Sequence, residues 1–250
     1  LIEGYRELLR ALNAGYPVQE LYVCPALFQG VNEPALIERF RQAGTEVFET
    51  SEPVFCKVAY RDRPEGLLGV GPQRHRRLAD LELATTPPPL LLVAEAIEKP
   101  GNLGTMLRSA DATGVSALIL CDPRTDVFNP NVVRASTGNL FTVPVVEADP
   151  AETILWLRER HVRLLAASPH ARQRFTDVDL TGPVAIVVGT EQFGLSERWV
   201  NASDLPVRIP MLGVADSLNV ATATALLLYE AVRQRMAAGI TADRGPMPED

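Results

Sequence analysis

The chain has few cysteines and histidines and no long apolar run, and each shortage removes a class of protein. Its three cysteines, Cys24, Cys56 and Cys121, are far apart and show no metal-ligand spacing. The three histidines share no ligand spacing either, so we expect no metal site. No apolar run approaches the ~20 residues that a membrane-spanning helix needs, so we expect no membrane partner. Unpaired cysteines in apolar surroundings favour a reducing, cytoplasmic setting.

The rest of the composition is that of an ordinary globular protein with a small basic region. The chain has 250 residues, 46% of them hydrophobic and 22% charged, and a net charge of −7. Acidic proteins repel nucleic acid, but local basic clusters still bind a phosphate backbone. A solvated linker is an equally good interpretation of residues 74–77. The candidate RNA contacts are Arg61, Arg63, Arg74, Arg76 and Arg77. Because the first residue is Leu1, we expect further residues to precede it.

Residues 1–72 alternate between helical and strand patterns and predict a small α/β domain. The expected helices cover 1–14, 33–43 and the short segment 51–58, and the expected strands cover 21–24, 67–70 and the residues from 47 onward. Residues 73–89 are polar and then rich in proline, which is typical of a linker.

Residues 90–237 predict a parallel α/β domain, and residues 238–250 a tail. Apolar runs predict strands at 90–94, 117–121, 142–146, 163–167, 184–188 and 206–209. Helices are expected at 103–113, 130–138, 151–160, 195–201 and 218–237.

The most informative segment, residues 98–114, follows the first of these strands. Pro100 and Gly101 break the strand, and Asn102 is placed to cap a helix that begins at Leu103. Arg108 then lies within two turns of that cap. A strand, a sharp turn and a capped helix present a site at the carboxyl edge of a parallel sheet.

A second glycine-rich segment, Gly189–Leu195, follows the strand at 184–188. Its spacing matches a phosphate-binding P-loop, but Leu195 replaces the required lysine, so nucleotide hydrolysis is not expected. Gly189 at a strand end allows a ligand to approach the backbone, with Glu191 beside it. The alternative is that Glu191 is a surface carboxylate capping the following helix.

A third segment, Ile209–Val220, joins a strand to a long apolar helix. Ser217 and Asn219 flank the start of that helix, and capping accounts for one of them but not for both. Three strand ends of this kind predict one composite pocket at the carboxyl edge of the sheet.

These three segments resemble, in order and spacing, the motifs of the SpoU/TrmH branch of the SPOUT RNA methyltransferases. The resemblance covers residues 90–237, and the segment from Asn129 to Gly138 is similar to a fourth family feature. Residues 1–72 are similar to the family's amino-terminal substrate-binding domain. The resemblance implies a trefoil-knotted parallel-sheet domain that follows a small α/β RNA-binding domain, and a homodimer in which two subunits complete the site.

The resemblance also implies transfer of a methyl group from S-adenosylmethionine to a ribose 2′-hydroxyl of RNA. Arg108 matches the family's catalytic arginine, and the supporting polar residues are Asn102, Glu191, Ser217 and Asn219. The implied cofactor contacts are Gly189, Ile209, Met211, Leu218, Thr137 and Gly138. Because an arginine holds its proton to a pKa above ~12, either a dry pocket removes that proton or Arg108 positions the substrate while another group accepts the proton.

The variant Glu98-Lys99-Pro100 before the first motif favours ribosomal RNA over transfer RNA as the substrate. Three alternatives stay open: a transfer RNA methyltransferase, a base methyltransferase of the same superfamily, and a non-catalytic RNA-binding or ribosome assembly factor on the same fold.

Overall fold

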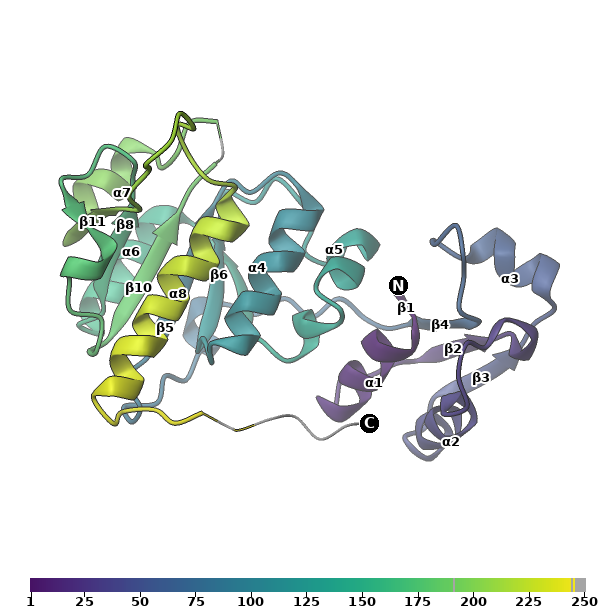
Figure 1. Cartoon of the computed structure of the whole chain (residues 1–250). Helices are drawn as coiled ribbons and strands as arrows, with labels where there is room; N and C mark the ends of the chain where they lie inside the picture. Colours follow the sequence, from purple (N-terminus) through teal and green to yellow (C-terminus); the bar gives the residue numbers. More distant parts are fainter. Residues whose placement is uncertain (191, 244, 246–250) are drawn as a thin grey trace. The chain divides into compact units, whose positions relative to one another are not determined.

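The protein consists of two compact units, each built from several stretches of chain (Figure 1). The computed structural model describes residues 1–190, 192–243 and 245. The first unit comprises Leu1–His75, Lys99–Arg108 and Thr125–Pro144. The second comprises Arg76–Glu98, Ser109–Arg124 and the chain from Val145 onward.

The first unit contains a four-stranded mixed sheet. Its strands are β1 (Ile2–Glu3), β2 (Glu20–Val23), β3 (Glu46–Glu49) and β4 (Leu67–Val70), in the order β1-β4-β2-β3. Strands β2 and β3 are parallel, whereas β4 runs antiparallel to both β1 and β2. Its helices are α1 (Tyr5–Asn13), α2 (Glu33–Gln42), α3 (Glu52–Val58), the start of α4 (Pro100–Ala112) and α5 (Pro130–Ala135).

The predicted helix at 1–14 is wrong in its first turn, since residues 2–3 form β1. Gly4 explains the difference, because its φ of +112° turns the chain between the strand and α1. The predicted start of α4 is also wrong, because the helix begins at Pro100 and includes Asn102 in its first turn. Proline is favoured at that position, where its missing N–H has no helical partner.

The second unit contains a seven-stranded sheet in which every strand pair of the described residues is parallel. The order is β7-β6-β5-β10-β8-β11-β9. The strands are β5 (Leu90–Glu95), β6 (Ala117–Cys121), β7 (Val145–Ala148), β8 (Arg163–Ala167), β9 (Gln173–Arg174), β10 (Val184–Val188) and β11 (Leu205–Arg208).

Helices cover both faces of this sheet. Helices α6 (Pro150–Glu159) and α7 (Glu197–Ala202) pack against β8, and α8 (Val220–Ala237) packs against β10. Figure 1 shows α8, in yellow, on the face opposite α6. Every residue of β5, β6 and β10 is buried, which is why these strands are apolar throughout, except for Glu95 at the end of β5. Short 3-10 helices lie at Pro25–Leu27, Leu78–Asp80, Asn139–Phe141 and Phe175–Asp177.

The strand predicted at 142–146 begins later, at Val145. The chain leaves α5 through Gly138, whose φ is +84°, and then forms a 3-10 turn. Pro144 follows and has no N–H to donate to a strand ladder, so pairing starts only after it. The trefoil knot implied by the resemblance stays a prediction.

Candidate functional site

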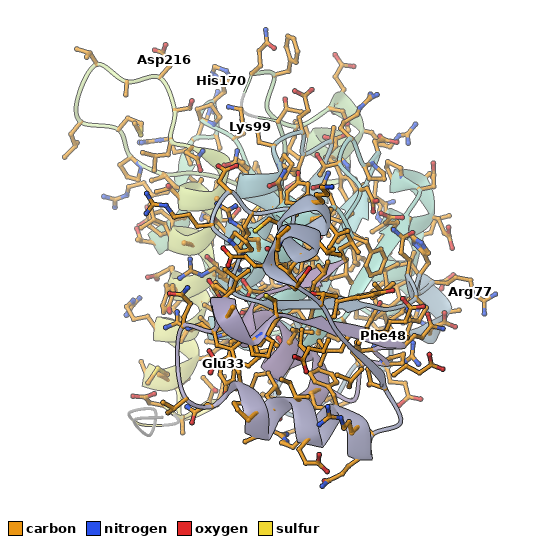
Figure 2. The ribbon with its side chains drawn as sticks, turned by 90° about the vertical axis from the view of Figure 1, so that its right-hand side faces the viewer. Glu33, Phe48, Arg77, Lys99, His170 and Asp216 are labelled. Carbon is orange, nitrogen blue, oxygen red and sulfur yellow. The ribbon has the colours of Figure 1, made fainter. Side chains whose placement is uncertain are left out.

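A cavity of about 780 Å³ opens at the carboxyl edge of the sheet in the second unit. Three loops line it, and they follow β8, β10 and β11. His170 on the first loop and Asp216 on the third both line the cavity, and Figure 2 shows them at the same end of the structure. The size and the mainly apolar walls suit a ligand of cofactor size. The predicted composite pocket is therefore confirmed for the two predicted segments after β10 and β11.

The loop after β10 folds back on itself. The main chains of Thr190 and Gly194 exchange two hydrogen bonds of 3.0 Å, and the Phe193 N–H donates to the Thr190 hydroxyl. A Cβ at Gly189 would lie 2.2 Å from the carbonyl oxygen of Gly194. Gly189 is therefore required by the loop itself, as well as lining the cavity. The predicted residue Glu191 lies outside the described residues.

The loop after β11 supplies the predicted residues Ile209, Met211, Ser217 and Leu218, all of which line the cavity. Asn219 is placed differently, at the N-cap of α8. Its amide oxygen accepts hydrogen bonds from the backbone N–H groups of Ala221 and Thr222, at 2.9 and 3.4 Å. The capping interpretation thus applies to Asn219.

Asn102 and Arg108 lie on the part of α4 that belongs to the first unit, and neither lines the cavity. The Arg108 side chain is exposed and forms no hydrogen bond or ion pair within the described part of the chain. Gly104, between them, allows α4 to approach α5 closely, because a Cβ there would lie 2.4 Å from the Ala135 Cβ. The glycine of the first motif therefore serves helix packing.

Thr137 and Gly138 also lie in the first unit and do not line the cavity. The Thr137 carbonyl and hydroxyl both accept hydrogen bonds from the Arg10 guanidinium on α1. A Cβ at Gly138 would lie 2.9 Å from the Cα of Glu7. The structure thus gives these two residues a packing role against α1, and their predicted cofactor contact stays a prediction.

The predicted basic face contains one residue that does not fit it. The Arg61 guanidinium is only 15% exposed and pairs with the carboxylates of Glu7 and Glu65. It also donates to the backbone carbonyl of Glu3. Arg61 is therefore a structural ion-pair residue, and its expected place on an RNA-binding face is corrected.

The other four arginines are exposed: Arg63, Arg74, Arg76 and Arg77. Arg74 lies over the ring of Tyr16, 5.6 Å from its centroid. Arg77 forms an exposed ion pair of 3.2 Å with Asp80. Such exposed contacts contribute little and are readily exchanged for a phosphate.

Sequence reasoning missed the loop after β8, where Ser168, Pro169 and His170 line the cavity. The available signal was the Ser-Pro pair directly after an apolar strand, which is typical of a strand end. It also missed Glu95, whose single charge at the end of an apolar strand was a visible anomaly.

Within the described residues, no group of three His, Cys, Asp or Glu side chains is arranged to hold a metal ion. No helix there is long and apolar enough to cross a membrane.

The sequence profile of the SpoU rRNA Methylase family matches residues 89–229. The chain belongs to this family. Residues 1–69 match the MRM3-like substrate binding domain. The SpoU match therefore covers the seven-stranded parallel sheet and its cavity, and the second match covers the small mixed-sheet domain before it.

Curated SpoU relatives match nearly the whole chain. The 23S rRNA (uridine(2479)-2′-O)-methyltransferase of Streptomyces viridochromogenes is 33% identical over 247 residues, covering 94% of this chain and 83% of the relative. The 23S rRNA (guanosine-2′-O-)-methyltransferase RlmB of Bordetella pertussis is 33% identical over 239 residues, covering 94% and 97%. The SpoU methyltransferase AviRb from S. viridochromogenes, solved in complex with AdoMet, is 31% identical with a TM-score of 0.83, covering 94% and 90%.

Proposed function

We propose that this SpoU protein transfers a methyl group from S-adenosylmethionine to a ribose 2′-hydroxyl of 23S ribosomal RNA. The observation that carries the proposal is the cavity whose walls are two of the family motifs, the loops after β10 and β11. Its relatives of known name methylate ribose hydroxyls of 23S rRNA, one at a uridine and one at a guanosine. The two relatives differ in nucleotide, so the proposal names the RNA and the reacting group only.

The cavity fits S-adenosylmethionine in size and chemistry. Ile209, Met211 and Leu218 supply apolar walls, and Gly189 leaves its backbone open to a ligand at the strand end. When bound, the cofactor supplies an electrophilic methyl group on a sulfonium. The protein's part is to hold that methyl group in line with an incoming hydroxyl, which supplies much of the rate by orientation.

The second part of the proposal concerns the polar set of Arg108, Asn102, Glu191, Ser217 and Asn219. An exposed guanidinium without a carboxylate partner binds a phosphate well, because its planar N–H groups match the oxygens of a phosphate. We therefore assign Arg108 to positioning the ribose-phosphate, while another group accepts the hydroxyl proton. Ser217 lies on the cavity wall, and we assign it to binding a polar group of the ligand.

RNA binding is assigned to residues 1–72 and to the exposed arginines Arg63, Arg74, Arg76 and Arg77. Contacts of this kind are electrostatic, so affinity for RNA falls steeply as salt rises.

The proposed domain boundaries are those predicted from the sequence, with a linker at 73–89 and the methyltransferase domain at 90–237. A homodimer and a knotted backbone are part of the same proposal, and light scattering of the purified protein tests the dimer.

Calorimetric titration with S-adenosylmethionine tests the cofactor part. We expect one site per chain, with an affinity that falls when Leu218→Arg places a charge on the cavity wall. Absence of binding to the unmodified protein would favour the non-catalytic RNA-binding factor instead. Arg63→Ala is the matched control, because that residue does not line the cavity and its loss leaves the cofactor affinity unchanged.

A further inference from the structure

Glu95 is an anomaly at the end of β5, one of the strands whose residues are all buried. Strand β5 is otherwise apolar, and Glu95 is only 6% exposed. Leu91, Val93 and Glu95 alternate onto one face, and the first two belong to the core cluster that contains Trp199 of α7. A carboxylate among such neighbours loses its hydration, which is costly unless a hydrogen bond replaces it.

Within the described residues, one long-range hydrogen bond replaces that hydration. The Ser196 N–H donates to Oε2 of Glu95 at 2.8 Å, across 101 residues of sequence. Ser196 is the residue at which the cavity loop ends and α7 begins. The loop between Gly189 and Leu195 lines the cavity along most of its length, so this bond fastens the far end of a cavity wall.

The near end of the loop is fastened by the sheet. Val188 of β10 pairs in register with Ala94 of β5, the residue before Glu95. Both ends of the loop are thus held on the end of β5, one by the ladder and one by the carboxylate. Between them the chain reverses through Gly194, whose φ is +68°.

We propose that Glu95 is a positioning residue that sets the shape of the cofactor loop, and that it is kept at this buried place for binding rather than for stability. This inference rests on the proposed function. An apolar side chain at position 95 would pack with Leu91 and Val93 without the cost of desolvation, and such replacements are often neutral or stabilising. The loop, however, would lose the bond at Ser196 and its fixed distance from the sheet.

Four variants of the full chain separate this role from a structural one. Glu95→Leu removes the acceptor, and Glu95→Gln keeps an oxygen that accepts the same N–H. Ser196→Pro removes the donor, and the Ser196 φ of −64° suits proline. Ser196→Ala keeps the donor and removes only a hydroxyl that makes no capping bond.

The readouts are the dissociation constant for S-adenosylmethionine by calorimetry and the midpoint of thermal unfolding. We expect Glu95→Leu and Ser196→Pro to weaken cofactor binding about ten-fold or more, the usual effect of losing a hydrogen bond to a charged group. The unfolding midpoint of Glu95→Leu stays at or above that of the unmodified protein, because the buried charge is gone. Ser196→Pro lowers the midpoint, because it leaves the buried carboxylate without its hydrogen bond. Glu95→Gln and Ser196→Ala bind within about three-fold of it. In methyl transfer, the loss appears in KM for the cofactor, and kcat at saturating cofactor is retained.

Two results would overturn the inference alone: unchanged affinity in Glu95→Leu and Ser196→Pro while the unmodified protein binds, or equal weakening by Ser196→Ala and Ser196→Pro. A fall in the unfolding midpoint of Glu95→Leu in proportion to its loss of affinity is a third such result, because the role would then be structural. Failure of the unmodified protein to bind S-adenosylmethionine is a different outcome, which defeats the proposed function together with the inference.

Discussion

Arg10 on α1 donates hydrogen bonds to both the backbone carbonyl and the hydroxyl of Thr137, 127 residues away. The same guanidinium donates to the side-chain oxygen of Asn139. Thr137 has a φ of +51° and Gly138 a φ of +84°, so two successive residues adopt the left-handed conformation. That conformation is costly for a β-branched residue such as threonine. The three hydrogen bonds hold this turn after α5 in place.

The first prediction follows from that contact. Arg10→Ala leaves two partly buried oxygens of the Thr137 turn without donors, and we expect the free energy of unfolding to fall by about 1–3 kcal/mol. Arg6→Ala is the matched control, because Arg6 lies on the same helix, is exposed and makes no bond within the described residues. Its effect should stay within about 0.5 kcal/mol. Urea unfolding followed by circular dichroism measures both, and equal effects would contradict the assignment.

The second prediction concerns the buried pair of Glu7 and Arg61, whose side chains are 2.8 Å apart. Burial raises the pKa of the Glu7 carboxyl above its ordinary 4.5, against the lowering effect of Arg61. Because the folded carboxyl holds its proton more tightly than the unfolded one, the protonated form of Glu7 stabilises the folded state. This stabilisation is fully present below pH 4.5 and is lost as the pH rises through the raised pKa.

Glu7→Gln removes the titrating group. We compare the unfolding free energy of the unmodified protein with that of the variant. We expect the difference, unmodified minus variant, to decrease as the pH is raised from below 4.5 to neutral. Denaturant titrations at a series of pH values measure the difference, which isolates Glu7 from the other carboxylates. A difference that grows with pH would mean that Arg61 dominates burial.

The third prediction concerns Arg235 near the end of α8, which is 5% exposed. Its guanidinium donates to four backbone carbonyls, those of Pro88, Pro89, Leu180 and Gly182. Arg235→Met leaves these oxygens unpaired, and we expect a loss of about 3 kcal/mol or more. The control is Arg233→Met, two residues away, whose 65%-exposed side chain pairs with Glu230 and should cost less than about 1 kcal/mol. A similar loss of unfolding free energy in both variants would show that the buried hydrogen bonds of Arg235 stabilise the protein no more than the exposed ion pair of Arg233.

The fourth prediction tests the role of Arg108. If its guanidinium positions a phosphate, Arg108→Ala should reduce methyl transfer by about 10²-fold or more, while the affinity for the cofactor is unchanged. Arg108→Lys should stay well below the unmodified rate, since lysine offers a point charge without the planar fork. A near-normal rate of methyl transfer by Arg108→Lys would show that the reaction does not require the planar guanidinium.

The sequence predicted the parts of the fold that rest on local patterns. The apolar runs at 90–94, 117–121 and 184–188 form central strands, because a strand buried on both faces needs apolar residues throughout. The loops after β10 and β11 line one cavity, although β8 lies between these strands, because the carboxyl ends of parallel strands lie at the same edge of a sheet. Both features follow from the spacing of apolar residues and from the order of strands and helices, which can be read from the sequence.

Contacts between distant segments could not be predicted in the same way. Arg61 was expected on a basic face, but Glu7, 54 residues earlier, pairs with it and buries it. Thr137 accepts hydrogen bonds from Arg10, 127 residues earlier, a contact that the motif spacing does not indicate. In both cases the deciding partner lies far away in the sequence, and no local spacing reveals it.

The central claim is tested most directly by analysing the product of the reaction. Purified protein is incubated with unmodified 23S ribosomal RNA and isotope-labelled S-adenosylmethionine, and the digested nucleosides are separated by mass spectrometry. We expect label in one 2′-O-methylated nucleoside, on the sugar fragment and not on the base, and we expect Arg108→Ala to abolish it. Label on a base, or an RNA that binds tightly but never acquires label, would contradict it.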